Sequence, residues 1–173
     1  MGGFGVYADA LFNTGDLNTR PITESRSEVS DLMEVANVGT DFYFAPAAGA
    51  TWSLFQRAFT EALVAQWPEA SVQTNQFDAE KSYVGLLVET RQYDGFFTNT
   101  ENLVVERGTA ADAAELVEWF LGLLPQDARI RFSSEIAVES GIHDDWWLTR
   151  DAGRQQIAEA LTDHLAAVLA GDS

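Results

Sequence analysis

The sequence predicts an α+β fold in a single domain spanning residues 1–173, with a mainly antiparallel sheet of about five strands and three to four helices packed largely on one face. The length of 173 residues suits one domain. Short apolar and aromatic runs between residues 82 and 106 are separated by Gly, Asp and Asn, which is typical of strands joined by tight turns. These strands cluster in the middle of the chain instead of alternating with helices. That order favours an antiparallel sheet over a wound parallel one.

The first third of the chain contains one clear helix. Residues 4–12 are short, apolar and Gly-rich, and we expect a first strand or an irregular entry there. Residues 13–23 are dense in Asn, Thr, Gly and Pro, which predicts an exposed loop. From Ser25 to Ala36 the apolar residues follow helical spacing, and Ser25 with Glu28 forms a potential capping box. A strand is expected over residues 41–44.

The middle third begins with the clearest helical pattern, over residues 51–67, which a proline ends. Residues 70–73 predict a short strand. The apolar run Tyr83–Val88 predicts a central strand with both faces covered. The pair Asp94-Gly95 is expected to form a turn between two strands.

The last third predicts two more helices. Thr109 is a natural N-cap for a helix with an acidic residue in its first turn. The alternating residues 129–132 predict a half-buried strand, which residues 133–140 either continue or leave as a loop. A last short strand is expected over residues 146–149, and a final helix over residues 151–170.

Charge is the most unusual property of the composition. The chain has 27 acidic against 10 basic residues, for a formal net charge of −17. Such a surface repels nucleic acid phosphates and anionic lipids, so it argues against nucleic acid and membrane binding and favours a basic protein partner. The alternatives are that the acidity serves solubility alone or reflects a salt-rich cytoplasm.

Two further properties of the composition bear on location. No apolar run approaches the roughly 20 residues needed to span a bilayer, and the first residues lack the features of a secretory signal. The absence of cysteine excludes disulfides, thiolate zinc sites and a cysteine nucleophile. Both properties fit a cytoplasmic protein.

The sequence offers no convincing catalytic, metal or cofactor site. It has no G-x-S-x-G element and no glycine-rich phosphate loop between a strand and a helix. Ser134, His143 and Asp144 can be drawn as a Ser–His–Asp set, but nothing in their spacing demands it. His143 with Asp144 and Asp145 lacks the spacing of a calcium loop, and His164 falls on or beside the apolar face of the last helix. We therefore expect a protein that is not an enzyme and that carries no cofactor.

Aromatic residues beside acids are the best candidates for binding a partner. In the strand after His143, neighbouring side chains point to opposite faces, so one tryptophan should enter the core and the other face outward. An exposed tryptophan with acidic neighbours is typical of a protein-binding hot spot, whereas the alternative is that it only packs. The expected partner-binding residues are Asp144, Asp145, Trp146, Trp147, Tyr93 and Asp94.

Three functions remain open at this point. The leading hypothesis is a protein that binds and neutralises a basic protein, in the manner of a bacterial toxin immunity protein or inhibitor. The first alternative is a small-molecule-binding domain or enzyme, with a pocket between the helix at 51–67 and the sheet that Tyr43, Tyr83 and Trp52 line. The second alternative is a salt-adapted housekeeping subunit.

Overall fold

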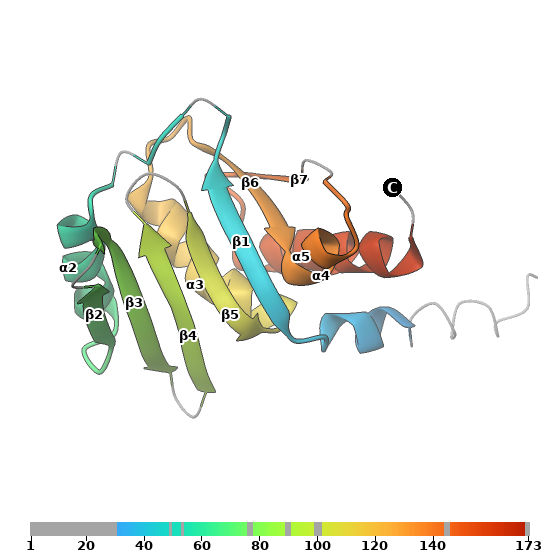
Figure 1. Ribbon diagram of the computed structural model, residues 1–173, viewed down its shortest axis with the longest axis horizontal. Coiled ribbons are helices and arrows are strands. Elements are labelled where there is room, and N and C mark those ends of the chain that lie inside the picture. Colours follow the sequence, from blue (N-terminus) through green and yellow to red (C-terminus); the bar gives the residue numbers. More distant parts are fainter. Residues whose placement is uncertain are drawn as a thin grey trace, which may run out of the picture.

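The fold is α+β and is built on one antiparallel sheet, which Figure 1 shows with α3 and α5 behind it. The computed structural model describes residues 31–48, 50–52, 54–75, 78–88, 91–98, 102–143 and 146–171. The sheet has seven strands in the order β2-β3-β4-β5-β1-β6-β7, and each strand runs antiparallel to its neighbours. The prediction of an α+β fold with an antiparallel sheet is therefore confirmed, with more strands than the expected five.

Elements follow one another in the chain as helices that flank a run of four consecutive strands. The strands are β1 (Thr40–Pro46), β2 (Ser71–Asn75), β3 (Asp78–Val88), β4 (Arg91–Thr98), β5 (Leu103–Gly108), β6 (Arg129–Ser134) and β7 (Trp146–Thr149). The helices are α2 (Gln56–Gln66), α3 (Ala110–Leu123), α4 (Glu135–Glu139) and α5 (Arg154–Ala170). Residues 31–36 are helical as well.

The main core lies between the sheet and the layer formed by α2, α3 and α5. Phe59 of α2 stacks on Phe97 of β4 with ring centroids 4.2 Å apart, and Phe120 of α3 meets both rings edge-on. Ile157 and Leu161 of α5 are fully buried in the same core. These three helices thus cover one face of the sheet, in line with the prediction that the helices pack largely on one face.

The position of Tyr83–Val88 in the sheet differs from the prediction. β3 is next to the edge strand β2, and its side chains alternate, with Tyr83 exposed while Val84 and Leu86 are buried. The strands at the middle of the sheet are β4, β5 and β1. A continuous apolar run was therefore a poor guide to which strand is central.

The expected turn at Asp94-Gly95 is also wrong, because both residues lie inside β4. Gly95 pairs with Val84 on one side and with Val105 on the other. A Cβ atom on Gly95 would collide with the backbone carbonyl oxygen of Val104. The glycine is needed for the close approach of two strands and does not reverse the chain.

Several helix boundaries are decided by contacts or caps. The helix expected over residues 51–67 begins only at Gln56. Trp52 lies before the helix, is buried in the core and meets Phe120 edge-on, with ring centroids 5.1 Å apart. Where residues 133–140 were expected as strand or loop, α4 forms, and the Ser134 hydroxyl accepts a hydrogen bond from the Ala137 amide at 3.3 Å. The expected cap at Thr109 is confirmed as a capping box with Asp112.

Some predictions fall outside the described residues. These are the first strand at 4–12, the loop at 13–23 and the start of the helix at 25–36, of which residues 31–36 are helical. Within the part of the chain that the structure describes, no helix is long and apolar enough to cross a membrane.

Candidate protein-binding face

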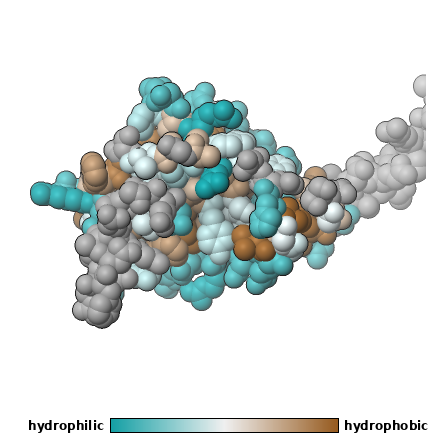
Figure 2. Space-filling model, turned by 45° about the horizontal axis from the view of Figure 1, so that its top comes forward, coloured by the Kyte–Doolittle hydropathy of each residue, from teal (hydrophilic) through white to brown (hydrophobic). Residues whose placement is uncertain are grey.

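The face of the sheet opposite the helix layer is called the open face here. In β1, Phe42 and Phe44 are buried toward the core, so Asp41, Tyr43 and Ala45 point to the open face. Figure 1 shows this face toward the viewer, with α3 and α5 on the other side. In Figure 2, hydrophobic residues form small separate groups among hydrophilic ones on the face that it views.

A band of mostly aromatic side chains crosses the open face from strand to strand. In register order it consists of Tyr83, Phe96, Val104 and Tyr43, and it continues into Ser133 of β6. Tyr83 and Phe96 meet edge-on with ring centroids 6.2 Å apart. Tyr83 is exposed, Phe96 and Tyr43 are half-buried and Val104 between them is only 1% exposed, so this aromatic band presents apolar surface on both sides of Val104.

Carboxylates flank the aromatic band. Asp94 and Glu106 are cross-strand partners on β4 and β5, and a hollow of about 280 Å³ lies beside them, where Gly85 has no side chain. Asp94 pairs with Arg107 at 3.4 Å. Asp41 accepts a hydrogen bond at 2.8 Å from the backbone amide of Arg107, a residue with a positive φ of 53°. Arg107 therefore bonds to two acids of the open face, Asp94 through its side chain and Asp41 through its backbone amide.

Several carboxylates of this surface act on the hydroxyl of Tyr43. Burial raises the pKa of Tyr43 above its ordinary value, and the charges of nearby carboxylates raise it further. The carboxylates that act on its hydroxyl are Asp41, Glu135, Glu139 and Glu106. The middle of the open face is thus under a negative potential that attracts cations.

A groove next to Tyr43, called the α4 groove here, lies at this end of the sheet. Its volume is about 300 Å³. Strands β1 and β6 form its floor, while α4 and the chain after it form a wall. The lining residues are Tyr43, Ala45, Arg131, Phe132, Ser133, Val138, Ile142 and His143.

The two predicted tryptophans of β7 point to opposite faces, as expected for a strand. Trp146 packs on the core side, against Phe132 and His164, with ring centroids 6.1 and 5.3 Å away. Trp147 pairs with Arg131 in the sheet and lies under the Arg129 guanidinium, 4.9 Å from its ring centroid. Trp147 therefore belongs to the open face, while Asp144 and Asp145 lie outside the described residues.

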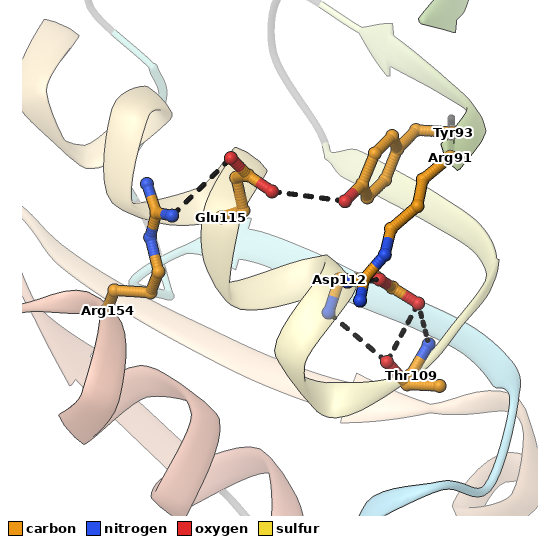
Figure 3. Close-up of polar contacts among 6 residues, drawn as sticks. All are labelled: Arg91, Tyr93, Thr109, Asp112, Glu115 and Arg154. Carbon is orange, nitrogen blue, oxygen red and sulfur yellow. Dashed lines mark hydrogen bonds and ion pairs between the residues drawn. The ribbon is translucent and has the colours of Figure 1, made fainter. Parts of the chain in front are cut away.

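The second predicted cluster is divided between the two faces. Tyr93 is only 5% exposed, and its hydroxyl donates to Glu115 of α3 at 3.1 Å (Figure 3). Burial and the hydrogen bond to Glu115 raise the pKa of Tyr93. Glu115 in turn pairs with Arg154 at 3.4 Å, so this network fastens the sheet to α3 and α5. Of Tyr93 and Asp94, only Asp94 faces the open side. Its strand β4 is four strands away from β7, which is roughly 19 Å.

Sequence reasoning missed a buried polar pair. The Ser134 hydroxyl and His164 Nε2 are 3.0 Å apart, and both residues are at most 1% exposed. Ser134 of the candidate Ser–His–Asp set is therefore bonded to His164 and not to His143, and it is closed to solvent. Thirty residues separate the pair, so no local spacing signals it. In the described part of the chain, no group of three or more His, Asp or Glu side chains is placed to hold a metal ion.

Three aromatic residues that were expected to line one pocket lie at three separate hollows. Tyr43 lines the α4 groove, Tyr83 the hollow by Asp94, and Trp52 a cavity of about 270 Å³ near Pro125. Where Phe59 of α2 meets the sheet, a cavity of only about 10 Å³ is left. Among the described residues, these three larger hollows therefore lie away from the contact between α2 and the sheet.

Comparisons with known proteins give no evidence of function, so the functional proposal starts from the open face. No protein-family model, no curated protein and no solved structure matches this chain significantly.

Proposed function

We propose that this chain binds a basic protein partner through the open face and neutralises it, in the manner of an immunity protein or inhibitor. The observation that supports this most directly is the surrounding of Tyr43. Its ring belongs to the aromatic band, and four carboxylates act on its hydroxyl. Aromatic side chains with a charged rim are the usual composition of a protein-binding hot spot.

The charge of the whole molecule supports the same proposal. A net charge of −17 steers a basic partner toward the protein and repels acidic ones. Seven strands at about 4.8 Å spacing give a face roughly 29 Å wide, and strands of about six residues make it roughly 20 Å long. Their product, roughly 580 Å², is about three quarters of the roughly 800 Å² that each partner buries in a standard interface.

The test compares two triple variants that change the net charge equally. Glu106→Gln, Glu135→Gln and Glu139→Gln neutralise acids around Tyr43. The matched control, Glu69→Gln, Glu159→Gln and Asp163→Asn, neutralises three acids that do not act on Tyr43 in this way. Both sets raise the formal net charge by three, from −17 to −14.

Partners are first captured from source cells and identified by mass spectrometry, and association is then measured by stopped flow at several salt concentrations. The face variant should slow association about tenfold at low salt, and the control variant by much less. Stoichiometric addition of the wild-type protein should abolish the partner's activity. Equal effects of both triples, or no effect of either, would contradict the proposal.

A further inference from the structure

We propose that the α4 groove seats one large apolar side chain of the partner, in a peptide segment whose flanking residues are Lys or Arg. This inference rests on the proposed function and names the feature of the partner that the site recognises.

The apolar part of the groove points to an apolar occupant. Val138 of α4 is 54% exposed, although Ala137 beside it is buried. Ile142, Ala45 and Phe132 line the same hollow. Removing such surface from water stabilises a complex by roughly 25 cal/mol per Å². A volume of about 300 Å³ is at the lower limit for small-molecule pockets, which suits one side chain with its backbone.

The polar groups of the groove suit the backbone of a peptide. Tyr43, Arg131, Ser133 and His143 come from three parts of the chain, and all four line the groove. Hydroxyl and guanidinium groups donate to carbonyl oxygens, which every peptide segment offers.

Arg131 is unusual among the arginines that the structure describes. Arg150 donates to backbone carbonyls, and Arg129 lies over a tryptophan ring. The other four pair with carboxylates: Arg57, Arg91, Arg107 and Arg154. The side chain of Arg131 makes no ion pair or hydrogen bond with any described residue, although its backbone pairs with β1 and β7 in the sheet. In so acidic a protein, a guanidinium without a carboxylate partner is available for the carbonyl groups of a bound segment.

The rim of the groove selects positive charge next to the apolar residue. Glu135 and Glu139 are exposed on α4 and four residues apart, so they lie on one side of the helix. Their charges reach Tyr43 on the groove floor. A Lys or Arg adjacent to the seated side chain would come close to both carboxylates, whereas a Glu there would be repelled.

The test uses end-blocked peptides and nuclear magnetic resonance of the full chain, without the partner. The probe is Lys-Lys-Trp-Lys-Lys, and its controls are Lys-Lys-Ala-Lys-Lys and Glu-Glu-Trp-Glu-Glu. The probe should shift the backbone amide signals of residues 43–45, 131–133 and 138–143. Each control peptide should bind about tenfold more weakly or worse.

Two variants of the protein test the groove itself. Val138→Asp places a charge on its apolar wall, and Arg131→Gln removes the guanidinium from an exposed position. Each should weaken the probe about tenfold, while Val64→Asp and Leu169→Asp should leave it unchanged. The latter two alter apolar residues that are 41% and 52% exposed on α2 and α5, and neither residue lines the groove. Unchanged binding in both Val138→Asp and Arg131→Gln would overturn the inference.

Other occupants give distinguishable results. If benzoate shifts the same signals at lower concentration than the peptide, the groove is a site for small carboxylates and the inference is wrong. If the captured partner binds the Val138→Asp protein as tightly as the wild type, the groove inference fails while the proposed function stands. If the probe occupies the groove but the triple charge variants leave the rate of partner association unchanged, the proposed function is wrong and the groove inference stands.

Discussion

At the scale of a single residue, the pKa of Tyr43 responds to the carboxylates of the open face. Its pKa is raised first by burial and then by four carboxylates. Because the raised pKa belongs to the folded state, folding holds the phenolic proton more tightly than the unfolded chain does. The contribution to stability is fully present below the ordinary value near pH 10, and it is lost as pH rises through the folded pKa.

The ionisation of Tyr43 can be followed by the ultraviolet absorbance of tyrosinate, with Tyr43→Phe assigning its share of the signal. In the wild type, that share should appear above the ordinary value of about 10. The double change Glu135→Gln and Glu139→Gln should lower the pKa of Tyr43, since two of the charges that raise it are removed. A Tyr43 pKa that is the same in the double variant and the wild type would show that α4 does not contribute to the potential.

At the scale of the element, β4 depends on a glycine. Gly95 sits where a side chain would meet the backbone carbonyl oxygen of Val104 on β5. The strand can accommodate a Cβ atom only by moving away from its neighbour, which would weaken the pairing at the middle of the sheet. This explains why a residue that usually marks a turn lies inside a strand.

Gly95→Ala should lower the free energy of unfolding by about 1–3 kcal/mol or more, because the added methyl group overpacks the contact between β4 and β5. The matched control is Gly122→Ala in α3, where a Cβ atom meets nothing within 4 Å. That change should raise the free energy of unfolding by about 0.5–1 kcal/mol, since alanine is the better helix former. Urea unfolding followed by circular dichroism measures both. Similar stability changes for the two variants would refute the role given to Gly95.

For the whole molecule, self-repulsion is the main electrostatic term. The described part of the chain has five ion pairs, and each has at least one well-exposed partner, so they contribute little to stability. The surplus of acids over bases remains unbalanced, and its repulsion destabilises the compact state.

Added salt should therefore stabilise the protein. We expect the thermal midpoint to rise when sodium chloride increases from about 0.01 M to about 0.15 M, as the Debye length falls from roughly 30 Å to 8 Å. A protein that unfolds outright at the lower concentration would favour the hypothesis of salt adaptation. Differential scanning calorimetry measures the midpoint, and potassium chloride serves as a control for ion-specific effects. A midpoint that falls with salt would show that the exposed ion pairs outweigh the repulsion.

The sequence by itself determined the features that depend on neighbours in the chain. The α+β class, the cap of α3 at Thr109 and the opposite directions of Trp146 and Trp147 follow from period and capping, which are local. The excess of carboxylates is likewise a property of composition alone.

Only the tertiary structure decided which of these residues meet. It placed β5 and β1 at the middle of the sheet, set Gly95 inside a strand and buried Tyr93 against Glu115. It also formed the α4 groove from β1, β6 and α4. Each of these outcomes depends on the register between strands or on packing between segments far apart in the chain, and no local pattern of residues encodes that register.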